Sequence, residues 1–214
     1  MEKLPTIAII GAGNVGGNLG VRLSQSGLEV CFGVRPGKSI DALLGRCGPG
    51  ASVTSPAEAA AAAEVIFIAV PAAAAVDAAR SLGDLAGKIV VDCNNPLRWD
   101  QGPVWSPPPE GSLSAAIAAA CPGARVVKAF NTFGAEFHLD PTLPGGPIDV
   151  ELAGDDPSAK ATVAAIAERA GFGVIDAGPL RSAALLENLA ILWIHLATVG
   201  GQGRTIGWRL LRRG

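Results

Sequence analysis

The sequence predicts an α/β fold: a doubly wound, mostly parallel sheet with helices on both faces, followed by a small C-terminal βαβα extension. Short β-branched runs alternate with helix-like segments along the 214 residues, and these runs contain few polar positions, as strands covered on both faces do. Almost half of the residues (49%) are apolar and 28 are glycine, which suits helices packed closely on a sheet.

The first 130 residues contain six predicted strands separated by mostly helical crossovers. Residues 14–25 predict the first helix because Val15, Leu19 and Leu23 recur on one helical face, and Gly27 ends it. The predicted strands are 6–10, 28–34, 52–54, 65–70, 88–92 and 125–130, and the longer predicted helices are 72–82 and 112–120.

The rest of the chain predicts a smaller unit. A Pro/Gly-rich loop (138–147) precedes a strand at 148–153, a helix at 157–170, a strand at 173–176 and a long apolar helix at about 180–199. We expect residues 1–130 to form one domain, with residues 131–214 packed on it as an extension within one compact unit.

Composition and charge exclude several function classes. A formal net charge of −2 gives no general attraction to nucleic acid or to an anionic membrane. The N-terminus lacks the apolar region of a signal peptide, and the apolar stretches are interrupted before the ~18 residues that span a bilayer. The four cysteines show no CxxC spacing, so no metal site is predicted. We expect a soluble, cytoplasmic protein with buried, reduced thiols.

A glycine-rich turn, Gly11-Ala12-Gly13-Asn14-Val15-Gly16, joins the first predicted strand to the first helix. In this context the free N–H groups and the positive end of the helix face the pyrophosphate of a dinucleotide. Gly11 permits the tight turn, Gly13 admits the phosphates, and Gly16 lets helix and strand pack closely. The turn therefore predicts a dinucleotide-binding Rossmann domain over residues 1–130.

The end of the second strand distinguishes between the two nicotinamide cofactors. NAD-binding domains usually carry an acid there, which bonds the ribose hydroxyls. Here the strand ends in Gly33-Val34-Arg35-Pro36-Gly37-Lys38, and Glu29 lies at the opposite end. Arg35 and Lys38 are suited to hold the 2′-phosphate of NADP, because a guanidinium binds phosphate especially well. We expect NADP(H).

Further residues follow the later strands, at the edge where α/β sheets bind ligands. Val70-Pro71 ends the fourth strand and is expected beside the ribose or nicotinamide. Asn94 and Asn95 follow the fifth, where they either orient the carboxamide or form a turn. Lys128 ends the sixth strand; with no carboxylate partner visible in the sequence, it receives no catalytic role and a structural one is at least as well supported.

Other polar residues have structural interpretations. His138 is expected in a flexible loop, and His195 in core or interface packing rather than proton transfer. Glu187 and Asn188 are interpreted as contacts to a partner. Asp155-Asp156-Pro157 resembles a metal-ligand pair, but carboxylates before a proline favour a helix N-terminus. Residues 98–111, with four prolines and two tryptophans, predict a surface loop near the ligand-binding edge.

Several motifs occur in an order that is specific to one family: IAIIGAGNVGGNLG, GVRPGK, IAVP, VVKAFNTFG, AGDDPSAK and DAGPL. With them the chain resembles, over nearly its full length, the coenzyme F420-dependent NADP oxidoreductases. The resemblance implies an enzyme that passes a hydride directly between NADP(H) and the deazaflavin ring of coenzyme F420. Alignment of two redox rings needs no catalytic acid or base, so no catalytic residue is assigned.

The resemblance also implies site residues. It places the phosphates against Ala12, Gly13, Asn14 and Val15, the 2′-phosphate at Arg35 and Lys38, and the nicotinamide at Val70-Pro71. The second ring is framed by residues 131–135 and by the turn around Ile206. Val34 replaces a hydroxyl residue common at the 2′-phosphate site. The predicted set is Gly11–Gly16, Val34, Arg35, Lys38, Val70, Pro71, Ala135 and Ile206 for the cofactor, and Asn131, Thr132 and Phe133 for the co-substrate.

Other functions stay open at this level. One alternative is an NADPH-dependent reductase of a flavin, a ferric chelate or a small carbonyl compound, with Trp99 and Trp105 as a substrate wall. Another is a non-catalytic NADPH sensor. The co-substrate is a small redox molecule in the leading hypothesis, and the apolar residues 185–196 of the last helix predict a homodimer.

Overall fold

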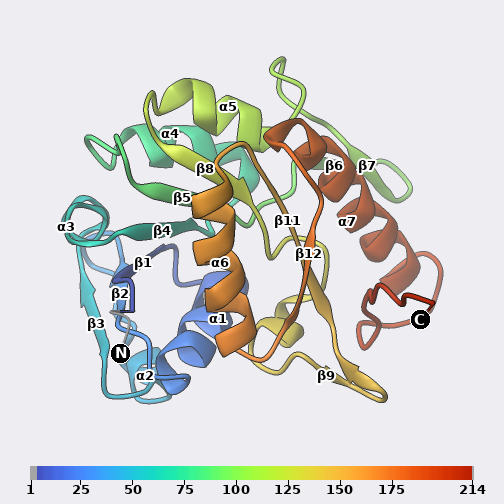
Figure 1. The fold of residues 1–214 in the computed structure, drawn as a ribbon, viewed down its shortest axis with the longest axis horizontal. Helices are drawn as coiled ribbons and strands as arrows, with labels where there is room; N and C mark the ends of the chain where they lie inside the picture. Colours follow the sequence, from blue (N-terminus) through green and yellow to red (C-terminus); the bar gives the residue numbers. More distant parts are fainter. Residues whose placement is uncertain (1–3, 214) are drawn as a thin grey trace.

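Eight strands form one sheet in the order β12-β11-β8-β5-β4-β1-β2-β3 in the computed structural model, which describes residues 4–213 (Figure 1). All neighbours pair in parallel except β11, which runs antiparallel to β8, so the predicted mostly parallel α/β sheet is confirmed. The strands are β1 Ile7–Ile10, β2 Val30–Gly33, β3 Ala51–Thr54, β4 Val65–Ile68, β5 Ile89–Asp92, β8 Arg125–Lys128, β11 Asp149–Gly154 and β12 Gly173–Asp176.

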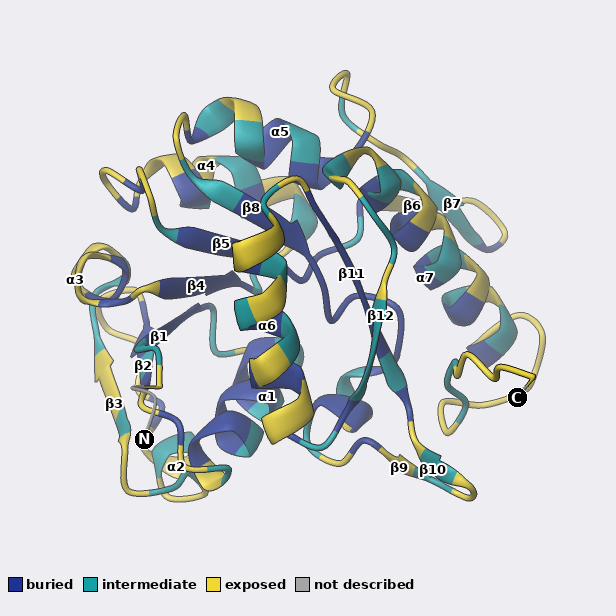
Figure 2. Ribbon diagram, in the orientation of Figure 1, coloured by how far each residue is buried: buried dark blue, intermediate teal, exposed yellow. Residues whose placement is uncertain are grey.

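Helices cover both faces of the sheet. On one face α1 and α6 enclose a core that includes Leu19, Phe67 and Val163; on the other, α3, α4 and α5 pack over Ile66 and Ile117. The central strands are buried throughout (Figure 2). The α-helices are α1 Asn14–Gln25, α2 Asp41–Leu44, α3 Pro56–Ala62, α4 Ala75–Arg80, α5 Leu113–Ala120, α6 Pro157–Arg169 and α7 Ala183–Ala197, and the 3-10 turns are η1 Ala72–Ala74, η2 Ala135–His138 and η3 Leu180–Ser182.

Two helix starts follow directly from the local sequence. Ser55 caps α3 in a capping box with Glu58, and a proline occupies the first helical position. Asp156 caps α6 with its side chain alone, which accepts a hydrogen bond from the Ala159 N–H at 2.8 Å, and Pro157 is the first helical residue. The helix-start interpretation of the Asp155-Asp156-Pro157 sequence is therefore confirmed for Asp156.

The Trp/Pro-rich segment is more regular than a loop. It forms a hairpin of β6 (Leu97–Trp99) and β7 (Pro103–Trp105), which packs beside α7 (Figure 1). Prolines are tolerated because this two-stranded ribbon has no further strand that needs their missing N–H groups. A shorter hairpin of β9 (Thr142–Leu143) and β10 (Gly146–Pro147) interrupts the other predicted loop.

The C-terminal helix corrects one expectation. The 18-residue segment Leu180–Ala197 has a mean hydropathy of 1.3, which is long and apolar enough to cross a membrane by length and composition. Arg181 and Glu187 interrupt this stretch, but two charges in 18 residues leave its mean hydropathy high. A third of the segment is buried inside the protein, where α7 packs against the hairpin and β11.

Candidate functional site

The glycine turn has the three environments that its motif predicts. Gly11 has a φ of +105°, and a Cβ there would lie 2.4 Å from the Ala69 carbonyl oxygen. A Cβ at Gly16 would lie 2.0 Å from the Gly11 oxygen, whereas a Cβ at Gly13 would meet nothing within 4 Å. Gly13 and Asn14 are exposed, so the space above the middle of the turn is open.

The first helix begins without a side-chain cap. Gly13 is its N-cap residue, no side chain accepts a hydrogen bond from the first turn, and no acidic residue lies there. Its first N–H groups are thus free of a protein side chain and carry the positive end of the helix dipole. An uncapped helix start over an open glycine suits the pyrophosphate of a dinucleotide.

The segment after β2 presents the two basic side chains to solvent. Val34 is buried, while Arg35 and Lys38 are both exposed in a turn closed by the Lys38 N–H and the Arg35 oxygen at 3.3 Å. Within residues 4–213 neither side chain forms a salt bridge. Both cations are therefore available to a phosphate at the end of β2.

The ends of β4 and β5 form the opposite part of this edge. Val70 is half-buried and Pro71 exposed, directly after β4. Asn94 is buried and connects the ends of β4 and β5. Its amide donates to the Ile68 oxygen at 3.0 Å and to Asp92 Oδ1 at 2.9 Å. Asn94 thus has the turn-forming role, whereas the half-buried Asn95 lies nearer the surface.

The three predicted co-substrate residues are buried rather than open. Asn131 is held by Asn95, to which it donates at 2.8 Å, and its own Oδ1 has no partner among the described residues. Thr132 donates to Glu151 Oε2 at 2.6 Å, and Phe133 stacks on Phe172 with ring centres 5.7 Å apart. Because they are buried, these three side chains support the surface of the expected co-substrate site and do not line it.

The segments that carry Ala135 and Ile206 both contact Trp193, although 71 positions separate the two residues in the sequence. Trp193 of α7 donates to the Ile206 oxygen at 2.7 Å, and a Cβ on Gly134 would lie 2.7 Å from its ring. The Asn18 amide of α1 donates to the Ala135 oxygen at 2.9 Å. These contacts connect the predicted second-ring wall to the helix that follows the glycine turn.

A salt bridge joins the unstructured C-terminal segment to the same wall. Arg204 donates to both carboxylate oxygens of Glu136, at 2.6 and 3.0 Å, and lies over the Trp193 ring at 5.5 Å. Arg204 also lowers the pKa of the Glu136 carboxyl through these hydrogen bonds. Arg204 and Ile206 both contact Trp193, so the segment that carries them is held against α7.

Sequence reasoning missed a buried ion-pair network. Lys128 does have carboxylate partners: Asp92 Oδ2 lies 2.8 Å and Glu187 Oε1 3.3 Å from its Nζ, and all three side chains are fully buried. The expected partner-subunit role of Glu187 is therefore wrong. Asp92 and Lys128 are register neighbours, a juxtaposition that two adjacent strand ends suggest, but nothing in the sequence points to Glu187.

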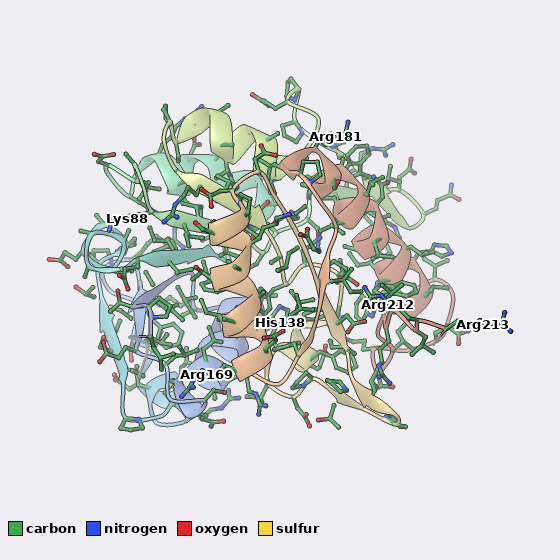
Figure 3. The ribbon with its side chains drawn as sticks, viewed as in Figure 1. Lys88, His138, Arg169, Arg181, Arg212 and Arg213 are labelled. Carbon is green, nitrogen blue, oxygen red and sulfur yellow. The ribbon has the colours of Figure 1, made fainter. Side chains whose placement is uncertain are left out.

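His138, labelled in Figure 3, differs from expectation, because it is buried in η2 and not in a flexible loop. Its Nε2 bonds the Phe130 oxygen at 2.9 Å. Burial lowers the pKa of His138 to about 4. Phe130 itself adopts a φ of +59°, so this bond holds a strained backbone turn after β8. His195 is exposed on α7, so of its two expected roles packing in the core is wrong and packing at an interface stays a prediction.

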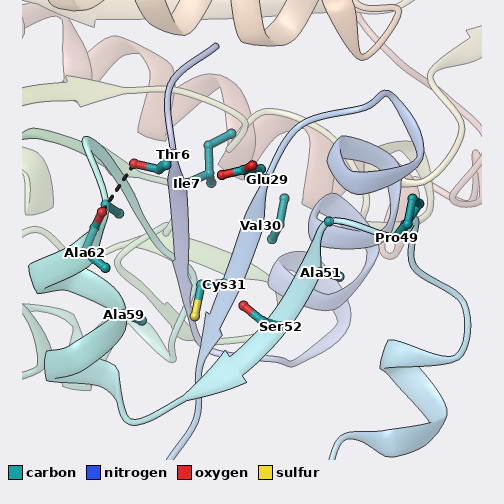
Figure 4. A pocket seen from close by; sticks show the side chains of 12 residues that line it. Thr6, Ile7, Glu29, Val30, Cys31, Pro49, Ala51, Ser52, Ala59 and Ala62 are labelled. Atoms are coloured by element: carbon teal, nitrogen blue, oxygen red, sulfur yellow. Dashed lines mark hydrogen bonds between the residues drawn. The ribbon is translucent and has the colours of Figure 1, made fainter. Parts of the chain in front are cut away.

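One pocket lies away from this edge. It has a volume of about 410 Å³ and lies at the N-terminal ends of β1, β2 and β3 (Figure 4). Its lining residues include Thr6, Glu29, Cys31 and Ser52. Ligands of parallel sheets bind at the carboxyl ends of the strands, where the glycine turn lies. Among the described residues no three His, Cys, Asp or Glu side chains gather as a metal site.

The chain is similar in sequence and in structure to known reductases. Residues 6–96 match the family described as NADP oxidoreductase, coenzyme F420-dependent. A crystal structure of a provisionally named F420-dependent NADP reductase from Arthrobacter sp. FB24 is 32% identical, with a TM-score of 0.86 over 97% of this chain and 100% of that one. A hypothetical protein from Sinorhizobium meliloti is 30% identical, with a TM-score of 0.74 over 84% of this chain and 88% of that one.

Two other similarities are narrower. Metalloreductase STEAP3 of Rattus norvegicus is 33% identical over 194 residues, 89% of this chain, but the chain spans only 37% of that protein's length. An imine reductase from Pseudomonas sp. is 18% identical, with a TM-score of 0.70 over 93% of this chain and 64% of that one, and shares the fold.

Proposed function

Because the chain belongs to the coenzyme F420-dependent NADP oxidoreductase family, we propose that it transfers a hydride directly between NADP(H) and a deazaflavin of the coenzyme F420 type. Family membership makes the protein an NADP-dependent oxidoreductase with a Rossmann fold. The deazaflavin is the proposed part, and the name of the Arthrobacter relative supports it.

One arrangement carries the cofactor assignment: Gly13 is open at the uncapped start of α1, and β2, the strand next to β1, is followed by two cations without a salt bridge among the described residues. The pyrophosphate fits the free N–H groups of α1, and the 2′-phosphate fits Arg35 and Lys38. Bound NADPH would supply the hydride, and these residues would fix its position. Val70 and Pro71 would then limit where the nicotinamide lies.

The second wall supports a flat acceptor. The Ala135 and Ile206 region is tied to α1 through Asn18 and to α7 through Trp193, so its position relative to the cofactor residues is fixed on two sides. Hydride transfer between two rings depends on such alignment and on exclusion of water. The buried Asn131, Thr132 and Phe133 would position this wall.

A ferric chelate is the second candidate acceptor, and the similarity to rat metalloreductase STEAP3 favours it. The test offers F420, FMN and a ferric chelate separately to purified protein with NADPH, and follows the loss of nicotinamide absorbance. We expect rapid oxidation with the deazaflavin only. Oxidation with only FMN or only the chelate would refute the deazaflavin, and tight NADPH binding without any oxidation would favour a sensor.

We also propose that the protein forms a homodimer through α7. The outer face of that helix exposes Leu185 (70% exposed) and Leu192 (47% exposed), and a second copy of the chain would cover them. Light scattering of the purified protein measures its mass directly. A monomer at micromolar concentration would contradict the proposal.

A further inference from the structure

The Lys128 network lies under the half of the sheet that faces the nicotinamide. The order β3-β2-β1-β4-β5-β8 is that of two mononucleotide-binding halves, which meet between β1 and β4. Arg35 follows β2, on the half that takes the adenosine 2′-phosphate. The other half, β4, β5 and β8, therefore takes the nicotinamide, and Asp92 and Lys128 end two of its strands.

Hydrogen-bond partners determine the charge of each group. Lys128 Nζ uses its three protons on Asp92, on Glu187 and on the Asn94 carbonyl oxygen, so it is an ammonium. Asp92 accepts from Asn94 N–H, Asn94 Nδ2 and Lys128, which are donors only, and from the Ser114 hydroxyl, and the Lys128 ammonium lies 2.8 Å from its Oδ2. Asp92 is therefore a carboxylate.

Glu187 is a carboxylate for the same reason. Its Oε1 accepts from the Leu113 N–H at 2.8 Å and from Lys128 at 3.3 Å, and its Oε2 accepts from Trp105 Nε1 at 2.8 Å. A protonated carboxyl would need an acceptor at one of these positions, and none of the three partners is one. Two carboxylates and one ammonium, all without solvent exposure, carry a net charge of −1.

We propose that this buried negative charge makes the site bind oxidised NADP⁺ more tightly relative to reduced NADPH, an inference that rests on the proposed NADP(H) site. The oxidised nicotinamide ring is a cation and the reduced ring is neutral, while the phosphates are the same in both. A fixed negative charge below the ring therefore acts on one redox state only. The network assists hydride donation by NADPH, because the product is stabilised electrostatically.

The expected size follows from the strand geometry. Asp92 is the register partner of Ile68, and Val70 lies two residues further on. With strands ~4.8 Å apart and a rise of ~3.3 Å per residue, the charge lies roughly 8–10 Å from the level of Val70. One unit charge at that separation in an effective dielectric of ~20 changes a binding ratio by roughly 15–30-fold.

The experiment measures Kd for NADP⁺ and for NADPH by calorimetry in the wild type and in Glu187→Gln. We expect the quotient of Kd for NADP⁺ over Kd for NADPH to rise roughly twentyfold in the variant, chiefly through weaker NADP⁺ binding. Trp105→Phe is the matched control: it removes a hydrogen bond to the same carboxylate but no charge, and it leaves the quotient unchanged.

Asp92→Asn provides a second neutralised network if Glu187→Gln does not fold, and it must change the quotient in the same direction. Equal weakening of both redox forms, or an unchanged quotient in a folded variant, would overturn the inference and leave the proposed function intact. A wild-type protein that binds neither form would instead overturn the proposed function.

Discussion

A methyl group added at Gly13 and one added at Gly16 meet opposite surroundings, so we predict opposite consequences for two alanine variants. At Gly13 the new Cβ has nothing within 4 Å, and the φ of −87° is ordinary for alanine. Gly13→Ala is expected to melt within about 2 °C of the wild type, because no packing changes. The methyl group would nevertheless occupy the space assigned to the pyrophosphate. Loss of one or two charged hydrogen bonds there weakens NADPH binding by roughly 10–100-fold.

At Gly16 the Cβ would lie 2.0 Å from the Gly11 oxygen and 3.1 Å from the Ala69 side chain. Both neighbours belong to the turn and the sheet, so α1 must move away from β1. Overpacking of this kind costs about 2–3 kcal/mol, which lowers Tm by roughly 5–10 °C in a chain of this size.

Thermal melts without ligand and NADPH calorimetry, applied to both variants, separate the two effects. Wild-type affinity in Gly13→Ala would refute the placement of the pyrophosphate over that residue. An unchanged Tm in Gly16→Ala would refute the close helix–strand contact.

Three further predictions use single sites. Arg35→Ala should weaken NADPH binding by about 1.5–3 kcal/mol and leave NADH binding unchanged in calorimetry, since only NADPH has the 2′-phosphate; an equal loss for both contradicts the assignment. Burial holds the pKa of His138 at about 4 in the folded protein, against 6.5 for a free imidazole. The neutral ring therefore stabilises the fold fully above pH 6.5, and about 3 kcal/mol of this stability is lost as the pH falls toward 4. Urea denaturation of the wild type and of His138→Gln at pH 7 and pH 4 should show this extra loss in the wild type only. Burial raises the pKa of the Glu151 carboxyl, so the wild type loses stability as pH rises through that folded pKa; Glu151→Gln should therefore raise Tm more at pH 8 than at pH 4, and an equal shift at both values would count against it.

Gly11 and Gly16 both approach Ala69 after β4, a contact far apart in the sequence. The glycine turn is nevertheless predictable from the sequence, because its three glycines lie within six residues in a recognisable motif between a strand and a helix. The same holds for Ser55 with Glu58, whose capping box spans four residues. The mostly parallel sheet is predictable as well, because apolar strands that alternate with helices favour parallel pairing.

The residues that sequence reasoning placed wrongly depend on contacts over long separations. Lys128 meets Glu187 across 59 positions, and Thr132 meets Glu151 on an antiparallel strand that no local pattern announces. His138 appeared to lie in a loop because its Pro/Gly-rich neighbours suggest one, yet its ring is packed against Phe133. The hydrophobic periodicity of a helix or strand predicts which of its faces is buried. It does not predict which polar side chains from other segments lie in the same interior.

The carboxylate of Glu187 has a consequence for how the last helix is retained in the fold. Segment Leu180–Ala197 has the composition of a bilayer-crossing helix, yet all the hydrogen-bond donors to Glu187 come from other parts of the chain. Transfer of α7 into hydrocarbon would carry an ionised group to mid-membrane and leave Lys128 with one carboxylate fewer, both of which are unfavourable. Glu187→Leu would remove this barrier and leave Arg181 as the last formal charge of the segment. During synthesis, such a chain would present a nearly uncharged hydrophobic helix to the membrane-insertion machinery before the sheet could bind it.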